Sequence, residues 1–526
     1  MEKQPEKQPD PELSDVSNNK HEELGGSPSP QLGHAKEFVD PDAHLSEKER
    51  AEIDRKLVWK LDMKLIPWLT LLYLASFLDR TNIGNAKIEG LQEDLRMTNS
   101  QYNAALTIFF VSYAVFEPLT NILLKRFRPS IFIPTIMVLW GICMTLMGVV
   151  NNYGGLMATR WFLGLTEAGL FPGVSYFLSC WYKRSEFGVR IALFFSAAAV
   201  AGSFGGLLAA AIAQMDTIGN RPGWAWIFIL EGLATVLLGV ISYWLVQDFP
   251  DEATFLSEDD RNRVLRRLAL DKQSSAEHEE FKMEYVYAAL KDWKTYLSAL
   301  IFAGTVEPLY AFSLFLPTII RDLVSTPLII IVFIVRLTSY KSTTAQLLSV
   351  PPYAVAACLT IAVGFYADRT RHRGMSNVCV SVLAIIGFSM LLGADNARLR
   401  YAGTFLGAMG IYPTISNTVS WVGNNTEGVY KRGIAIGFVV GFGNLNGVVS
   451  SNIFRGKDAP NYYPGHGTIL AYLVLFVFGG SLLQHILLRI ENGKRLRGER
   501  DHWIEGLDAE AIDKLGDRRP DFLYTL

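Results

Sequence analysis

Long apolar segments separated by short polar ones run along the chain from residue 64 to residue 488. A helix needs about 20 apolar residues to cross the ~30 Å hydrocarbon core of a bilayer, and each segment reaches about that length. Six segments precede a polar stretch at residues 247–294 and six follow it. The pattern predicts an all-α membrane protein with twelve transmembrane helices in two six-helix bundles. The expected spans are residues 64–82, 102–124, 130–150, 154–177, 191–214, 225–246, 295–320, 345–366, 375–393, 401–422, 433–454 and 468–488.

The same pattern sets the domain boundaries. Residues 49–246 form the expected N-terminal six-helix bundle and residues 295–489 the C-terminal one, joined by a cytosolic linker at residues 247–294. The linker is charged and has a 3.6-residue period, which favours a soluble helix or two. Residues 1–48 are polar, so we expect a disordered cytosolic tail, and residues 490–526 form a second cytosolic tail.

The stretch before the first span is amphipathic. A helix-start pattern stands at Ser46 to Glu49, and apolar residues then recur on one face of residues 49–60. We expect this segment to lie along the inner surface of the membrane.

Composition and loop charges agree with a membrane protein. Hydrophobic residues make up 50% of the 526 residues and charged residues 19%, and the mean hydropathy is +0.21, which is too apolar for a soluble enzyme of this length. Lys and Arg gather in alternate short loops, as at residues 125–128, 183–190 and 369–373, which places both termini in the cytosol. We expect a multi-pass protein of the plasma membrane.

The sequence carries no pattern typical of an enzyme. It shows no nucleophile–base pair and no phosphate-binding loop. The cysteines lie in or at the ends of apolar segments without metal-ligand spacing, so we expect no disulfide framework, no metal site and no cofactor. They are Cys143, Cys180, Cys358 and Cys379.

The first apolar segment carries Asp79 and Arg80 side by side near its far end. Insertion scales put the cost of a charged residue near the centre of a transmembrane helix at roughly 2.5–3.5 kcal/mol, so a chain that keeps two has a use for them. One interpretation is that they form half of the working site of a transporter. The alternative is an ion pair at the lipid headgroups, because Asn82 and Gly84 follow closely.

Two motifs resemble those of a known family. Residues 364–373, GFYADRTRHR, resemble the loop motif GxxxDRxxxR of the major facilitator superfamily, although the matching stretch at residues 121–127 lacks its Gly and Asp. Residues 160–169, RWFLGLTEAG, look like the fourth-helix motif RxxxGxxEA. With LYLASFLDRTNIGNA, WIFILEG and the ending LGDRRPDF, the chain from about residue 62 onward is similar to the fungal branch of the anion:cation symporters, which includes allantoate and nicotinate permeases.

The resemblance implies a two-bundle, alternating-access carrier that moves the anion of a weak acid together with protons. Residues of the first and fourth helices line the central cavity in that family, and they match Asp79, Arg80, Arg160 and Glu167. A substrate-binding Asn of the tenth helix in bacterial relatives matches Asn417. The loop motif implies a gating role for Gly364, Asp368, Arg369 and Arg373.

Chemistry suggests roles for the two charged pairs. Arg160 and Glu167 are seven residues apart, so both project from one face of their helix. The proton affinity of a buried carboxylate depends on a nearby guanidinium, which makes Asp79 beside Arg80, and Glu167 beside Arg160, the candidate proton-coupling residues. A guanidinium binds a carboxylate through two parallel hydrogen bonds, so Arg80 and Arg160 are candidate substrate-binding residues.

Further acidic residues lie within apolar segments. Glu307, with Tyr310 one turn on, departs from the apolar residues expected there in this family; it would tune specificity or add a second titrating site, and we count both as candidate substrate-binding residues. Glu117 either lines the cavity or compensates a carbonyl freed by the following proline. Glu231 is expected to be a structural partner of a loop or helix donor.

These observations favour a symporter that moves a small organic anion, nicotinate-like or another carboxylate, inward with protons. Two alternatives stay open: an exporter of an acidic secondary metabolite, and a nutrient sensor that uses the carrier fold without flux. The expected partners are the small organic anion, protons and the lipid bilayer, and the net charge of −2 gives no indication of nucleic acid.

One segment breaks the pattern between the seventh and eighth spans. Residues 324–339, VSTPLIIIVFIVRLTS, contain an apolar run too short to span a bilayer and, in an outer loop, exposed to water. We hypothesise that this segment is a translated intron; the alternative is a genuine outer hairpin or a short helix on the membrane. Sequencing the transcript is expected to show a message without these codons, and a dominant message that retains them would contradict the hypothesis.

Overall fold

The computed structural model describes residues 42, 44–270, 283–324, 341–455, 458, 461–508, 511–512 and 515–526. Residues from Asp40 onward belong to one compact unit. Most of the expected N-terminal tail at residues 1–48, and all of the hypothesised insert after Val324, lie outside the described residues.

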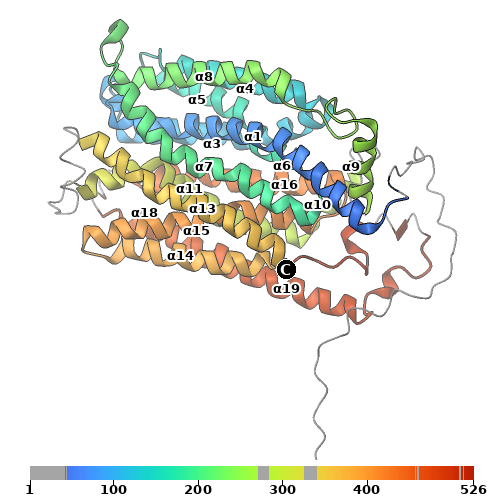
Figure 1. Ribbon diagram of the computed structural model, residues 1–526. Coiled ribbons are helices and arrows are strands. Elements are labelled where there is room, and N and C mark those ends of the chain that lie inside the picture. Colours follow the sequence, from blue (N-terminus) through green and yellow to red (C-terminus); the bar gives the residue numbers. More distant parts are fainter. Residues whose placement is uncertain are drawn as a thin grey trace, which may run out of the picture. The chain divides into compact units, whose positions relative to one another are not determined.

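The described chain folds into helices, with no strand among its residues, and twelve transmembrane helices follow in the order that the apolar pattern predicts (Figure 1). Those of the N-terminal half are α1 (Glu47–Ile88), α3 (Asn99–Arg126), α4 (Pro129–Met147), the pair α5 (Tyr153–Glu167) and α6 (Leu170–Ser179), α7 (Arg184–Ala213) and α8 (Gly223–Leu245). Those of the C-terminal half are α11 (Trp293–Val324), α13 (Lys341–Thr370), α14 (Arg373–Gly393), α15 (Ala397–Asn424), the pair α16 (Val429–Asn444) and α17 (Asn446–Ile453), and the run α18 (Tyr463–Tyr472), η4 (Leu473–Gly479) and α19 (Gly480–Leu496).

Short helices connect these spans. They are α2 (Leu91–Asp94), η1 (Ile218–Asn220), α9 (Glu258–Leu270), α10 (Met283–Leu290), η5 (Asp501–Trp503) and η6 (Gly516–Arg518). Among the described helices, nine stretches are long and apolar enough to cross a membrane by length and composition. The remaining spans are α3, α15 and the α5–α6 pair, whose two helices have 15 and 10 residues.

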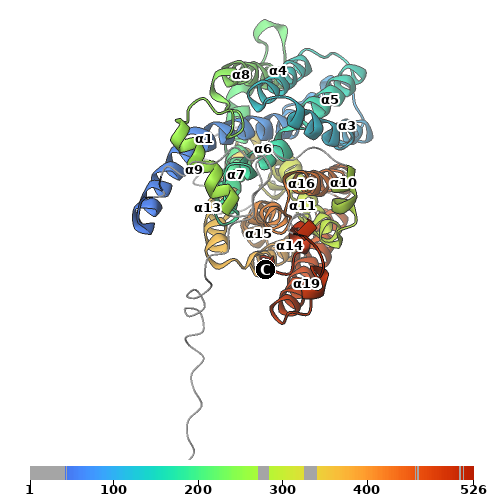
Figure 2. The same cartoon turned by 90° about the vertical axis from the view of Figure 1, so that its right-hand side faces the viewer.

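The two halves of the chain form two bundles that meet along two seams. Figures 1 and 2 show the N-terminal half in blue to green beside the C-terminal half in yellow to red. At one seam α7 packs along α13 and α15, and at the other α3 packs along α16 and α17. Small residues permit this approach: a Cβ on Gly364 of α13 would lie 2.5 Å from Cβ of Ala192 on α7, so no side chain fits there.

Helix α1 is longer than its apolar core. Its start at Ser46 is confirmed: the Ser46 hydroxyl accepts from the N–H of Glu49, and the Glu49 carboxylate accepts from the N–H of Ser46. The helix then runs without a break to Ile88, so residues 49–60 are the first turns of α1 rather than a separate helix on the membrane surface. Ion pairs with other helices hold this extension, with Lys60 Nζ 2.7 Å from Asp260 of α9 and Arg190 of α7 2.6 Å from Asp62.

Three of the spans are interrupted. The fourth breaks after Glu167, the eleventh breaks after Asn444, and the twelfth contains the π-helical turn η4. Irregular backbone at membrane depth occurs where it is buried in protein or lines a cavity, and it often marks functional positions. Glu167 and Asn444 each end a helix segment at such a break.

The C-terminal segment, residues 515–526, is folded against the bundle that it follows. The carboxylate of Asp517 is buried between Lys294 Nζ (2.6 Å) and Lys431 Nζ (2.5 Å), which belong to α11 and α16. Arg495 of α19 donates to the carbonyl oxygens of Asp517, Arg519 and Phe522. This segment therefore ties three helices together at one end of the C-terminal bundle.

Asp517→Asn is expected to destabilise the protein by about 1.5–3 kcal/mol at pH 7, because it leaves two buried ammonium groups with the single carboxylate of Asp292, 3.1 Å from each. Burial raises the pKa of Asp517, but Lys294 and Lys431 outweigh it and hold this pKa below its usual value. A carboxyl with a lowered folded-state pKa contributes stability above its unfolded pKa and loses it as pH falls through the folded value. Thermal unfolding in detergent should therefore show a gap between wild type and variant that is large at pH 7 and closes below about pH 4.

A matched control lies in the same segment. Asp521 is exposed, with 57% of its side chain accessible, so Asp521→Asn should change the stability by less than about 0.5 kcal/mol. Equal unfolding temperatures for Asp517→Asn and wild type at pH 7 would contradict the assignment of this ion cluster.

Candidate functional site

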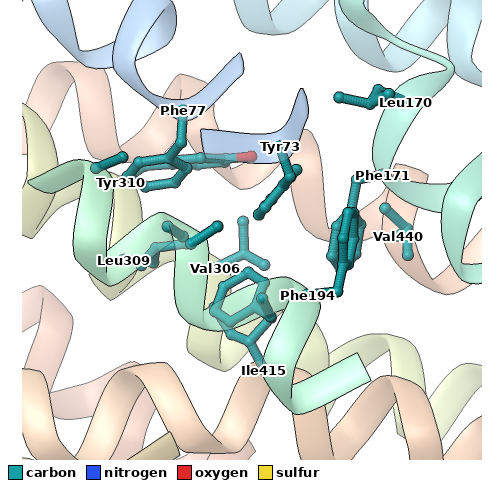
Figure 3. Packing of buried hydrophobic residues seen from close by; sticks show 14 of the residues in the cluster. Tyr73, Phe77, Leu170, Phe171, Phe194, Val306, Leu309, Tyr310, Ile415 and Val440 are labelled. Carbon is teal, nitrogen blue, oxygen red and sulfur yellow. The ribbon is translucent and has the colours of Figure 1, made fainter. Parts of the chain in front are cut away.

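A small cavity lies where the two bundles meet. Aromatic and aliphatic side chains form most of its wall, and several of them, such as Tyr73, Phe171 and Tyr310, are seen in the packed cluster of Figure 3. Arg80 and Asn444 bring polar atoms to the wall. Helices of both bundles contribute, namely α1, α3, α6 and α7 from one and α11, α15 and α16 from the other. The lining residues are Tyr73, Arg80, Tyr113, Phe171, Phe195, Phe302, Val306, Leu309, Tyr310, Ile415 and Asn444.

The guanidinium of Arg80 is the charged group of this wall. It is 3% exposed, donates from Nη2 to Glu167 Oε1 at 2.7 Å and donates from Nη1 to the Tyr310 hydroxyl at 2.7 Å. Its Cζ lies 4.9 Å from the ring centroid of Tyr113. Arg80 is thus held by a carboxylate of its own bundle and a phenol of the other, with an aromatic face beside it.

Glu167 is the partner of Arg80. It ends α5, is fully buried, and its Oε1 accepts a second hydrogen bond of 2.5 Å from the hydroxyl of Ser76 on α1. Its Oε2 has no hydrogen-bond partner among the described residues. Among the described residues the ion pair of Glu167 is with Arg80 of the first helix rather than with Arg160, although Arg160 remains within electrostatic reach of Glu167.

Arg160 lies deeper in the N-terminal bundle. It is fully buried, its Nε donates to the carbonyl of Ala105 at 3.2 Å, and within the described chain Nη1 and Nη2 have no hydrogen-bond partner. The ring of Phe109 lies against both guanidiniums, 4.7 Å from Cζ of Arg160 and 5.5 Å from Cζ of Arg80. Arg160 is therefore close to the cavity but is not one of its lining residues.

Asp79 faces away from Arg80. Its Oδ2 accepts from Trp140 Nε1 at 3.0 Å and from the hydroxyl of Thr235 at 2.8 Å, which belong to α4 and α8. Consecutive residues of a helix point about 100° apart, so Arg80 faces the cavity while Asp79 faces the interior of its own bundle. The structure brings Arg80, Glu167 and Tyr310 together and leaves Asp79 outside this group.

Glu231 is a second buried carboxylate inside the N-terminal bundle. Its Oε2 accepts from Asn82 Nδ2 at 2.5 Å. The expectation of a helix donor for this carboxylate is confirmed, and neither Glu231 nor Asn82 lines the cavity.

Asn444 and Glu117, which the sequence did not single out for substrate binding, complete the site through Tyr310. The Tyr310 hydroxyl donates to Asn444 Oδ1 at 2.7 Å, and Asn444 Nδ2 donates to Glu117 Oε2 at 3.1 Å. The sequence allows two roles for Glu117, lining the cavity or compensating a carbonyl freed by the following proline. In the structure Glu117 is fully buried and belongs to the hydrogen-bonded group of Tyr310 and Asn444. The signal for Asn444 was an amide inside the apolar, Gly-rich stretch GFGNLNG.

Two expected substrate-binding residues lie elsewhere. Glu307 is fully buried, is not among the cavity-lining residues, and within the described chain has no hydrogen-bond partner for either carboxylate oxygen. Asn417 donates to Asn377 and to the carbonyl of Arg373. On α15 it is Ile415, two positions earlier, that reaches the cavity, and residues two apart on a helix point to nearly opposite sides.

The loop motif lies at the seam between α7 and α13. Asp368 pairs with Arg373, and its Oδ2 accepts from the backbone N–H of Val189 on α7 at 2.6 Å. Arg373 is buried and also donates to Asn417 at 3.0 Å. Arg369, in contrast, is exposed, so Asp368 and Arg373, with Gly364, are the motif residues at the contact between bundles.

The second seam, between α3 and α17, also carries contacts between the bundles. Asn452 Nδ2 of α17 donates to the hydroxyl of Thr107 on α3 at 2.9 Å. The ring of Phe110 fills the place of a side chain at Gly447, where a Cβ would lie 2.2 Å away. No group of three His, Cys, Asp or Glu residues that could hold a metal ion occurs in the described part of the chain.

Comparisons with known proteins agree with this architecture. The family model described as Major Facilitator Superfamily matches residues 69–451. The chain is 34% identical over 457 residues to a protein of Schizosaccharomyces pombe named "Uncharacterized transporter C1002.16c", covering 86% of each chain. It is 30% identical over 475 residues to the "High-affinity nicotinic acid transporter" of Saccharomyces cerevisiae, covering 90% of this chain and 85% of that protein. Among solved structures, the proton:xylose symporter XylE bound to 6-bromo-6-deoxy-D-glucose superposes with a TM-score of 0.58 at 13% identity, covering 80% of this chain and 96% of that one.

Proposed function

Because this chain belongs to the major facilitator superfamily, whose relatives named above are transporters, we propose that it is a symporter that carries a small organic anion together with protons. The single observation that carries the proposal is the pair of buried guanidiniums near one closed cavity, of which Arg80 is shared between Glu167 and Tyr310. The cargo we propose is a nicotinate-like or other small carboxylate. The 30% identity to a nicotinic acid transporter supports this class.

An anionic cargo follows from the charges of the site. Arg80 and Arg160 are two buried guanidiniums; Arg80 has Glu167 in direct contact, whereas Arg160 has no hydrogen-bond partner for Nη1 and Nη2 among the described residues. A carboxylate from the cavity would meet the planar guanidinium of Arg80, which can bind it through two hydrogen bonds, and the aromatic faces of Tyr113 and Tyr310. The site therefore suits a small acid with an apolar or aromatic body.

Proton coupling follows from competition for Arg80. When the carboxylate of the cargo takes the guanidinium, Glu167 loses its counter-charge inside a buried site. A buried carboxylate without a cation takes up a proton more readily. Anion binding at Arg80 and proton binding at Glu167 would then favour each other, as the reciprocity of coupled binding requires.

Alternating access would use the two seams. We assign the end that carries Asp368, Arg373 and residues 515–526 to the cytosol, with both termini on that side, and the end that carries Thr107 and Asn452 to the exterior. The contacts at both ends join one bundle to the other. Rocking of the bundles would break one set and keep the other, which opens the cavity to one side at a time.

Uptake by yeast cells that express the protein in the plasma membrane tests this proposal. Labelled nicotinate and a panel of small mono- and dicarboxylates would be supplied at external pH 5 and pH 7, with and without an uncoupler. We expect inward accumulation of a monocarboxylate that is larger at pH 5 and lost with the uncoupler. Efflux from preloaded cells without uptake would support an exporter of an acidic metabolite instead, and binding without flux would support a sensor.

A further inference from the structure

A chain of hydrogen bonds runs from Arg80 to a second carboxylate and crosses between the bundles twice. Arg80 of α1 donates to Tyr310 of α11, Tyr310 donates to Asn444 of α16, and Asn444 donates to Glu117 of α3, at 2.7, 2.7 and 3.1 Å. Every donor points the same way, from the guanidinium toward Glu117. The chain thus connects the central cation, Arg80, with the carboxylate of Glu117.

Glu167, which binds Arg80 directly, and Glu117, which is linked to Arg80 through Tyr310 and Asn444, differ in their hydrogen-bond donors. Glu167 accepts from Ser76 and Arg80, which both belong to α1 of the same bundle. Glu117 accepts from Asn444, which belongs to the other bundle. A rocking movement of the bundles as rigid bodies leaves the first set of contacts in place and separates the second.

The position of Glu117 makes its charge sensitive to that movement. The side chain is fully buried, and a Cβ on Gly441 of α16 would lie 3.5 Å from its Oε2, so the backbone of the other bundle closes over the carboxylate. Among the described residues, Arg80, Tyr113 and Tyr310 are charged or titratable groups within electrostatic reach of Glu117. In such a place a carboxylate stays ionised only while donors and a cation face it.

We propose that Glu117 is a second proton-accepting residue of the carrier, one that senses the conformation of the bundles, whereas Glu167 responds to the bound anion. This inference rests on the proposed function. With the α3–α16 seam closed, the N–H of Asn444 and the chain from Arg80 favour the carboxylate. When the seam parts, Glu117 loses the N–H of Asn444 and takes up a proton from the water on the open side.

Infrared difference spectroscopy tests the proton site without any substrate. Purified protein in lipid nanodiscs would be cycled between pH 8 and pH 5, and the carbonyl band of protonated buried carboxyls recorded. We expect Glu117→Gln to lack one component of this band. Glu231→Gln is the matched control: it removes an equally buried acid whose partner Asn82 lies on the same bundle, and its spectrum should keep the Glu117 component.

A second variant keeps the test decisive if Glu117→Gln folds poorly. Asn444→Ala leaves the acid in place but removes the N–H that stabilises its charged form, so the Glu117 component should persist to higher pH than in the wild type. A component that titrates unchanged in Asn444→Ala, or pH-difference spectra of Glu117→Gln equal to those of the wild type, would overturn the proposal.

The conformational part is tested by distances across the cytosolic seam. Spin labels at Ser185 of α7 and at His372, both exposed, would be introduced after replacement of Cys143, Cys180, Cys358 and Cys379. We expect the distribution of distances to shift between pH 8 and pH 5 in otherwise wild-type protein and in Glu167→Gln, and to lose most of this shift in Glu117→Gln. A full shift in Glu117→Gln would refute a conformation-sensing role.

These measurements separate the two proposals. If no acid is taken up by cells while Glu117 behaves as expected, the proposed cargo is wrong and the proton site stands. If a carboxylate is accumulated and depends on Glu167, but Glu117→Gln titrates and moves like the wild type, only the further inference fails.

Discussion

Arg80→Lys is expected to weaken the apparent affinity for nicotinate, or for the best-transported acid of the panel, by about 10- to 150-fold. The guanidinium of Arg80 reaches Glu167 through Nη2 and Tyr310 through Nη1 at the same time. A single ammonium keeps the charge but cannot hold both partners and also bind a carboxylate through two hydrogen bonds. Loss of one hydrogen bond to a charged group costs roughly 1.5–3 kcal/mol, which gives the stated factor.

The measurement is the concentration dependence of initial uptake rates. Arg190→Lys is the matched control, because Arg190 is bound through two nitrogens by Asp62 at the end of the bundle, away from the cavity. That variant should keep the wild-type affinity. An unchanged apparent affinity in Arg80→Lys would remove Arg80 from the substrate site.

Glu167→Gln should abolish accumulation of the anion while leaving exchange between the two sides of the membrane. The amide can still accept from Ser76 and Arg80, but it cannot take the proton that we expect to travel with the cargo. In proteoliposomes with an interior two pH units more alkaline, one coupled proton supports an accumulation of about 100-fold, because each pH unit is worth about 1.36 kcal/mol. The variant should reach a ratio of about one.

The control for this experiment is again Glu231→Gln, which alters a buried carboxylate of the same bundle that does not reach Arg80. It should accumulate the anion as the wild type does. Concentrative uptake by Glu167→Gln would show that the proton is carried by another residue.

The arrangement of helices could be predicted from the sequence because apolar length is a local property. Each span shows itself by about 20 apolar residues, and the helix start at Ser46 by its capping residues. The unbroken α1 could not be seen in this way. Its charged first turns resemble a surface helix, and only their ion pairs with α7 and α9 show how this extension is held.

The site was harder to predict because the partner of a charged residue is set by distance in space and not by distance along the sequence. Asp79 and Arg80 are adjacent in the sequence, and for that reason they point to different places in the helix. The actual partner of Arg80 is Glu167, from another helix. Asn417 was assigned from its match to an Asn of bacterial relatives, and Glu307 as an acidic residue where the family has apolar ones. Which face of the helix such a residue occupies depends on neighbours that are distant in the sequence.

Asn444 and Glu117 show the same limit, because they belong to the site but could not be assigned to it from the sequence. Each is a polar residue in an apolar span, and the hydrogen bond that joins them crosses the seam between the bundles. Contacts between distant segments of this kind leave no periodic signal in a single sequence.

The ring of Phe109, which lies against the guanidiniums of both Arg80 and Arg160, bears on selectivity by charge number. Under the proposed function, a monoacid bound at Arg80 would use one guanidinium, and a diacid would need a second cation. Since the ring of Phe109 contacts both guanidiniums, we expect it to stand between such a diacid and Arg160. We therefore expect a smaller side chain at position 109 to improve the binding of diacids relative to monoacids.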